Sequence, residues 1–187
     1  MPQILKDMDR ARKTEIESLR VGVINNIHSI YQKADKMVVL DSLALQIDTG
    51  SLIDVAVILS LGRWIARMWT VVEARLGNRV LIKTANGEVD LDEIVSLLEE
   101  EAIEASHRYG VLLRILSTTR GKASHLARSG LHDLVEAFRH SHTGDNVDRV
   151  RAAFPLLGLR WEAGWGQEEA SMANGESLGV TMQYPLS

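Results

Sequence analysis

The chain has 187 residues, a length that suits one domain, or one domain with an appendage, better than two independent domains. Its composition, 45% hydrophobic and 25% charged, is typical of a folded globular protein and excludes wholesale disorder and collagen-like repeats. With 21 basic against 25 acidic residues the net charge is −4, so no overall field draws the chain to nucleic acid or to an anionic membrane. The absence of cysteine excludes disulfides, thiolate zinc sites and cysteine nucleophiles.

The sequence carries no targeting pattern. Its N-terminus, MPQILKDMDRARK, is charged from the sixth residue and lacks the apolar stretch of a signal peptide. The longest charge-free apolar run near mid-chain, Val55 to Gly62, is far shorter than the roughly 20 residues that cross a bilayer. We therefore expect a cytoplasmic protein with no membrane span.

The first part of the chain predicts a long helix and then a short strand. A 3-4-4-3-4 spacing of apolar residues, which places them on one face of a helix, predicts a helix over 12–34. The segment 36–40 is short, apolar and rich in β-branched residues, as a strand buried on both faces is. Asp41 and Ser42 follow it directly, where the ligand crevice of an open α/β sheet lies. A polar exit from the strand explains the pair equally well.

The rest of the chain alternates between helical and strand patterns as far as Pro155, beyond which no period remains and we expect irregular structure. In chain order the predicted elements are a helix capped by Ser51 over 51–60, a helix from Arg63 to Leu76 stopped by Gly77 and Asn78, a strand over 80–83, a tight turn at 86–87, a helix capped by Asp90 and directed toward 103, helical patterns within 111–139, and a short helix over 145–154.

This order of elements predicts the α/β class, dominated by helices, with further helices toward the C-terminal end. Only two strands are visible, and two parallel strands alone stabilise each other poorly. The alternative is a helical scaffold in which 36–40 and 80–83 are buried helix or loop.

Three segments resemble the fungal heterokaryon-incompatibility (HET) domains. The run Ile30–Ser42, IYQKADKMVVLDS, is similar to the family's "IY..A..VVVLDS". The run Ser60–Glu73 looks like its "S.W..R.WTLQE", with Val71-Val72 in place of Leu-Gln and the serine one residue further from the first tryptophan. The run Asp145–Trp161 resembles the "D.V.A..PLLGL.W" that follows the domain in many such proteins.

The family's opening segments, "Y..LSY.WG" and "W.D..CI.Q", have no counterpart in this sequence. The resemblance therefore implies the C-terminal portion of a HET/TIR-like α/β domain over 1–105, a helical extension over 106–160 and an irregular tail over 161–187. A truncated and non-functional gene product is an alternative.

HET domains are similar to TIR domains, which share a flavodoxin-like fold and in several branches cleave NAD at the nicotinamide–ribose bond. The resemblance implies a partial flavodoxin/TIR-like parallel sheet with few strands, with Glu73 as the catalytic residue of an NAD glycohydrolase. Glu73 would hold the ribose hydroxyls and stabilise an oxocarbenium-like transition state. The cofactor-binding residues would be Asp41, Ser42, Arg67 and Trp69. Alternatively, Glu73 is an ordinary helix glutamate paired with an arginine, an interaction worth ~0–1 kcal/mol.

The function that the resemblance implies is fungal nonself recognition and programmed cell death signalling, through association with itself or with other HET-domain proteins. NAD cleavage is the alternative, with NAD as a substrate. No metal site is predicted, because no two of the histidines at 125, 132, 140 and 142 stand four residues apart, as the two histidines of a zincin motif do.

Overall fold

The computed structural model describes residues 3–121, 131–139, 141–144, 146–162 and 165. These residues form an α/β protein dominated by helices, in agreement with the predicted class. In chain order the elements are α1 (Gln3–Lys33), β1 (Met37–Val39), the 3-10 helix η1 (Ala44–Gln46), α2 (Leu52–Leu61), α3 (Arg63–Ala66), α4 (Met68–Leu76), β2 (Val80–Lys83), β3 (Glu88–Asp90), α5 (Leu91–Arg120), α6 (Leu131–Arg139), α7 (Asn146–Arg151) and α8 (Ala153–Leu156).

The sheet has the strand order β1-β2-β3 and is mixed. Met37 lies opposite Val80 in the parallel pair β1–β2, and Lys83 lies opposite Glu88 in the antiparallel pair β2–β3. The two strands predicted at 36–40 and 80–83 are therefore parallel neighbours, and the alternative that these segments are helix or loop is wrong. The expectation of a wholly parallel sheet is corrected, since β3 runs antiparallel.

Sequence periodicity does not reveal β3, because the strand has three residues and leads straight into a helix. The predicted turn before it is present: the backbone of Thr84 donates to the Gly87 carbonyl at 3.0 Å, and the Thr84 hydroxyl accepts from the Gly87 N–H at 3.2 Å. Asp90 ends the strand and also caps α5, accepting from the backbone N–H of Asp92 at 3.0 Å.

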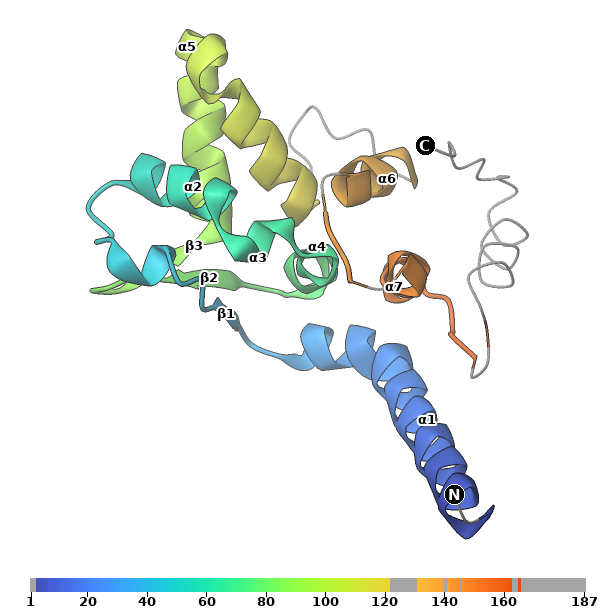
Figure 1. Ribbon diagram of the computed structural model, residues 1–187. Coiled ribbons are helices and arrows are strands. Elements are labelled where there is room, and N and C mark those ends of the chain that lie inside the picture. The colour runs from blue at the N-terminus through green and yellow to red at the C-terminus, as the bar shows by residue number, and fades with distance from the viewer. Residues whose placement is uncertain (1–2, 122–130, 140, 145, 163–164, 166–187) are drawn as a thin grey trace. The chain divides into compact units, whose positions relative to one another are not determined.

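The core lies between the sheet and the helices α2 to α5, which cover one face of it (Figure 1). Val39, Val80 and Ile82 point into this core from two strands and are almost fully buried. Leu59 of α2 and Leu98 of α5, both without exposed surface, pack against them from the helical side.

The apolar stripe of α1 is largely exposed. Of its members, Ile16, Leu19, Val23 and Ile30 are exposed by 44%, 65%, 58% and 54%, whereas Ile24, outside the stripe, is buried. The periodicity correctly indicates a helix, which begins at Gln3 rather than near residue 12.

Two compact units divide the chain differently from the predicted boundaries at 105 and 160. One unit, which we call the central unit, is Ile30–Gly144, and the other joins residues 1–29 to 145–187. The helix α5 crosses residue 105 without ending, although Ala105 has non-helical angles (φ −138°, ψ 54°) that kink it. Most of the expected irregular tail over 161–187 lies outside the described residues.

The unit that joins the two ends of the chain has its own centre at Trp161. This indole is 1% exposed and packs edge to face on Phe154, with ring centroids 5.1 Å apart. Asn25 of α1 bonds both backbone groups of Trp161, donating to its carbonyl at 2.8 Å and accepting from its N–H at 2.7 Å. The guanidinium of Arg151 lies 5.1 Å from the centroid of the same ring.

Arg120, the last residue of α5, is the most connected polar residue of the central unit. Its side chain has no exposed surface, and all five N–H groups donate. Two reach the carboxylate of Asp92, at 2.6 and 3.1 Å, in the first turn of the same helix. The other three reach the carbonyls of Ala74, Gly77 and Asn78, where α4 ends and the chain turns into β2.

Replacing Arg120 should therefore destabilise the whole unit. Arg120→Ala would leave a carboxylate and three carbonyls without their donor, and we expect a loss of about 3–5 kcal/mol in the free energy of unfolding. Arg120→Lys keeps the charge but not the planar guanidinium, so its free energy of unfolding should lie between those of the wild type and of Arg120→Ala. The measurement is urea denaturation.

Arg108, exposed on the same helix, provides the matched control. Arg108→Ala should change the free energy of unfolding by less than about 0.5 kcal/mol. Equal effects of Arg120→Ala and Arg108→Ala would contradict the role given to Arg120.

Candidate functional site

The predicted helix from Arg63 to Leu76 is broken in two at Arg67. This residue is extended (φ −83°, ψ 138°) and forms an isolated parallel β-bridge with His142. The backbone of His142 donates to the Ala66 carbonyl at 2.7 Å, and its own carbonyl accepts from Met68 at 3.0 Å. A segment distant in the sequence thus supplies the hydrogen bonds that the interrupted helix lacks.

The break decides which side chains meet Glu73 on α4. The indole Nε1 of Trp64, on α3, donates to Glu73 Oε2 at 2.9 Å. The guanidinium of Arg67 lies 3.3 Å from the same oxygen and 3.4 Å from the other. Glu73 thus contacts Trp64 of α3, and the arginine pairing given as the alternative for Glu73 is present.

Glu73 lies in a pocket of about 580 Å³ within the central unit. Every residue of β1 lines this pocket and, among the described residues, none of β2 does, so the pocket lies along the edge of β1 that faces away from β2. The lining residues are Tyr31, Met37, Val38, Val39, Leu40, Asp41, Ser42, Arg63, Trp64, Arg67 and Glu73.

Asp41 is part of the pocket wall, but its carboxylate is occupied. The residue is 3% exposed and accepts from the backbone N–H of Leu43 at 2.9 Å, of Ala44 at 3.4 Å and of Trp64 at 3.0 Å. Gly62 permits this contact, since a Cβ at that position would lie 2.6 Å from Asp41 Oδ2. Asp41 therefore holds the turn after β1 against the start of α3, and offers no free oxygen pair to a ligand.

The other predicted site residues divide between the pocket and its surroundings. Ser42 and Arg67 are exposed and line the pocket together with Glu73, whose side chain is 21% exposed. Trp69 is half-buried on α4 and is not among the lining residues. Thus four of the five predicted residues come together in one pocket and one does not.

Tyr31, in the last turn of α1, also lines this pocket, although the sequence analysis gave it no role. It stands in the segment that resembles HET domains, but nothing in the sequence indicates that it lines the same pocket as Glu73. Burial raises the pKa of the Tyr31 hydroxyl above its ordinary range, the negative charge of Glu73 raises this pKa further, and Arg67 acts in the opposite direction. Tyr31 is therefore a protonated donor at neutral pH.

No cluster of metal-ligating side chains occurs among the described residues. His142 acts through its backbone, in the bridge to Arg67, while His125 and His140 lie outside the described ranges. In the same described part of the chain, every helix is too short or too polar to cross a bilayer.

Comparison of the chain with models of protein families, with curated proteins and with solved structures finds no significant match.

The charge of Glu73 should be visible in the titration of Tyr31. In Glu73→Gln one contribution that raises the pKa of Tyr31 is gone while Arg67 still lowers it, so tyrosinate should form at lower pH than in the wild type. Ultraviolet absorbance of tyrosinate measures this, and Tyr31→Phe identifies the transition among the three tyrosines.

The raised pKa of Tyr31 in the folded state also makes the free energy of unfolding depend on pH. Tyr31 favours folding below the ordinary tyrosine pKa, and this contribution is lost as pH rises through the folded pKa. Glu88→Gln, on the exposed surface of β3, should not shift the titration. An unshifted Tyr31 transition in Glu73→Gln would show that the two groups do not interact.

Proposed function

We propose that this chain is a HET-like protein of fungal nonself recognition and cell death signalling, and that it acts by self-association through α1. The resemblance of its three segments to HET domains motivates the first part. The observation that supports the second is the exposed apolar stripe of a 31-residue helix.

Part of the stripe fits the heptad pattern of a parallel two-stranded coiled coil. If Ile16 takes heptad position a, Leu19 takes d, and Val23 and Ile30 take the next two a positions, so that β-branched residues stand at a and a leucine at one d. Asn26 takes the d position between Val23 and Ile30, so the apolar seam is short. Ile16, Leu19 and Val23 are all exposed, so contact with a second copy of the helix would bury apolar surface.

The charges beside the stripe fit a second copy of the same helix. In this register Glu15 takes position g and Arg20 the following e, the positions whose side chains form ion pairs between two parallel helices. Among the described residues, Arg20 forms an ion pair with Glu17 of the same helix, at 3.9 Å and largely exposed. Glu15 and Arg20 of opposite copies would therefore pair on both sides of the seam.

Sedimentation equilibrium of the purified chain tests this association. The wild type should form a concentration-dependent dimer, and Leu19→Asp should weaken it by about 10-fold or more, since a buried leucine is worth about 1.5–3 kcal/mol. Arg20→Glu should weaken it a few-fold, and Glu15→Arg combined with Arg20→Glu should restore it, because an exposed pair contributes ~0.2–1 kcal/mol.

Ile103 provides the control, because it is 85% exposed on α5 and lies outside the stripe. Ile103→Asp should leave the dimer unchanged. A chain that stays monomeric at high concentration, alone and when mixed with a HET-domain protein, would contradict association. If the chain forms a dimer that Leu19→Asp does not weaken, the interface does not include the stripe of α1.

A second candidate function is hydrolysis of NAD in the pocket of Glu73. It is supported by the meeting of Asp41, Ser42, Arg67 and Glu73 in one pocket, with the Glu73 carboxylate held in place by an indole N–H and a guanidinium. In the reaction the bond between ribose C1′ and the nicotinamide nitrogen breaks, and its electron pair leaves with nicotinamide. Water adds to C1′ and releases a proton, while the carboxylate stabilises the positive charge that develops on the ribose.

Release of nicotinamide from NAD tests this candidate. Glu73→Gln should lower the rate by about 100-fold or more, because the charge that opposes the developing cation is lost. Trp64→Phe, which keeps a ring but removes the donor to Glu73, should lower it less. Glu100→Gln, on the exposed face of α5, should have no effect. Release that is absent, or equal in wild type and Glu73→Gln, would exclude Glu73 as a catalytic residue.

A further inference from the structure

The strand β1 ends the sheet on one side, and no strand of the described residues pairs with its outer edge. The register of the β1–β2 pair and the hydrogen bond from the Met37 N–H to the Arg79 carbonyl, at 2.8 Å, show which way its backbone groups point. Met37 and Val39 direct theirs toward β2, so Val38, between them, directs its N–H and C=O away from the sheet. These two groups can bond to a further strand.

The opposite edge of the sheet is protected by charge, whereas the edge of β1 is not. On β3, Glu88 and Asp90 both form ion pairs, at 3.1 and 3.3 Å, and charged edge strands discourage the addition of another strand. The residues of β1 are all apolar. Val38 is 37% exposed, and Leu40, which follows the strand, is 71% exposed.

The pocket of Glu73 provides space for an added strand. Every residue of β1 lines this pocket of about 580 Å³, and its further walls come from Tyr31 and from residues of α3 and α4. A groove beside an open strand edge binds extended peptides by β-strand addition, in which backbone hydrogen bonds give affinity and side-chain contacts give specificity. Because β1 is short, we expect a dissociation constant of about 0.1 mM.

One positively charged side chain of the pocket has no ion-pair partner. The guanidinium of Arg67 pairs with the Glu73 carboxylate at 3.3 Å, and the Asp41 carboxylate accepts from three backbone N–H groups. Arg63 also lines the pocket, is exposed, and takes part in no ion pair within the described part of the chain. A carboxylate on the bound segment would complement this charge.

We infer that the pocket of Glu73 binds an extended segment of a partner protein, which is apolar except for one acidic side chain and adds to the sheet beside β1. Its backbone bonds to the N–H and C=O of Val38, and its apolar side chains pack beside Val38 and Leu40. Its carboxylate pairs with Arg63. The inference requires neither cleavage of NAD nor association through α1, so it stands or fails separately from both.

Isothermal titration calorimetry with synthetic peptides tests the inference. The probes are short acetylated and amidated peptides of alternating valine and threonine, with one glutamate placed at each position in turn. The tightest of them should bind a few-fold more weakly when its glutamate is replaced by glutamine, as expected for one exposed ion pair. Arg63→Gln should abolish this difference, whereas Arg108→Gln, on the exposed surface of α5, should preserve it.

Methylation of the peptide nitrogens, one at a time, shows whether the peptide binds as a strand. Successive residues of a strand direct their N–H groups to opposite sides, so methylation at every second position should weaken binding by about 10-fold or more. Methylation between these positions should have little effect. In the protein, saturating peptide should slow amide hydrogen exchange at Val38 more than at Val39, whose N–H already bonds to β2.

A substitution within β1 removes the proposed donor. Val38→Pro lacks the N–H that faces the peptide but keeps the bonds between β1 and β2, because proline is tolerated on an edge strand where its nitrogen faces outward. It should abolish peptide binding. Val38→Ala keeps the N–H and should bind within a few-fold of the wild type. Thermal unfolding of each variant shows whether it is folded.

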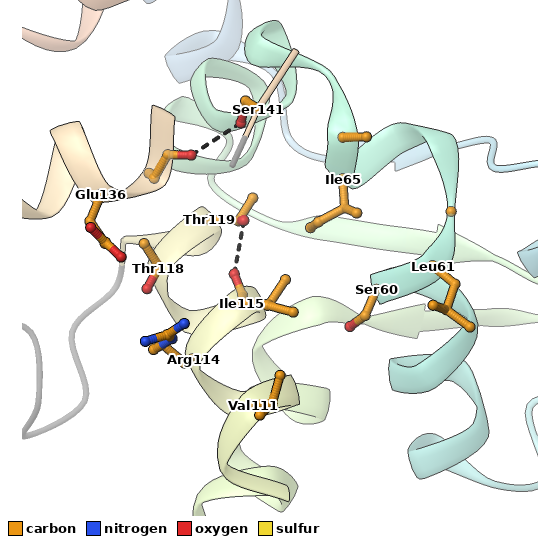
Figure 2. A pocket seen from close by; sticks show the side chains of 13 residues that line it. Ser60, Leu61, Ile65, Val111, Arg114, Ile115, Thr118, Thr119, Glu136 and Ser141 are labelled. Atoms are coloured by element: carbon orange, nitrogen blue, oxygen red, sulfur yellow. Dashed lines mark hydrogen bonds between the residues drawn. The ribbon is translucent and has the colours of Figure 1, made fainter. Parts of the chain in front are cut away.

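Val111 provides a control for adsorption of the peptide to another apolar surface. It is 65% exposed and lines a second pocket, of about 400 Å³, between α2 and α3 on one side and α5 and α6 on the other (Figure 2). This pocket shares no lining residue with the pocket of Glu73. Val111→Ser should therefore leave peptide binding unchanged.

Three results would overturn the inference. The first is that no peptide of the set binds saturably at about 1 mM. The second is that methylation weakens binding equally at every position, or that folded Val38→Pro binds as the wild type does. The third is that the Val38 amide is already protected from exchange without peptide and loses this protection on dilution, because the edge of β1 would then pair with a second copy of the chain.

Discussion

The five hydrogen bonds donated by the buried guanidinium of Arg120 are the constraint on which the central unit depends. They hold the end of α4 and the turn toward β2 against the first turn of α5. A helix end buried without donors would leave its carbonyls without hydrogen bonds. The resulting loss of free energy would be a large fraction of the stability of a small domain. Because Glu73 stands one residue before the first of these carbonyls, the same side chain fixes the position of the candidate site.

Local patterns in the sequence predict most of the elements of this fold. The strands at 36–40 and 80–83, the turn at 86–87 and the capping role of Asp90 all depend on neighbours within a few residues, so a single sequence contains the necessary information. Four predicted site residues also meet in one pocket, as the resemblance to HET domains implies. Asp41 and Ser42 follow the end of β1, while Arg67 precedes α4 and Glu73 lies within it.

The features that the sequence does not predict are those that arise between distant segments. The helix is broken at Arg67 because His142 pairs with it, and no residue near Arg67 signals that partner. The stripe of α1 has the period of an amphipathic helix, but period alone does not show whether the rest of the chain covers its apolar face. Likewise, the sequence does not show that the break at Arg67 brings Trp64 to Glu73.

The four-residue helix α3 separates the two pockets and belongs to both. Trp64 reaches Glu73 on one side, and Ile65 lines the pocket of about 400 Å³ on the other (Figure 2). With one turn of helix and an extended residue at its end, α3 has little rigidity of its own and takes its position from what surrounds it. Because residues of α3 line both pockets, any displacement of this helix would change the walls of the two pockets together.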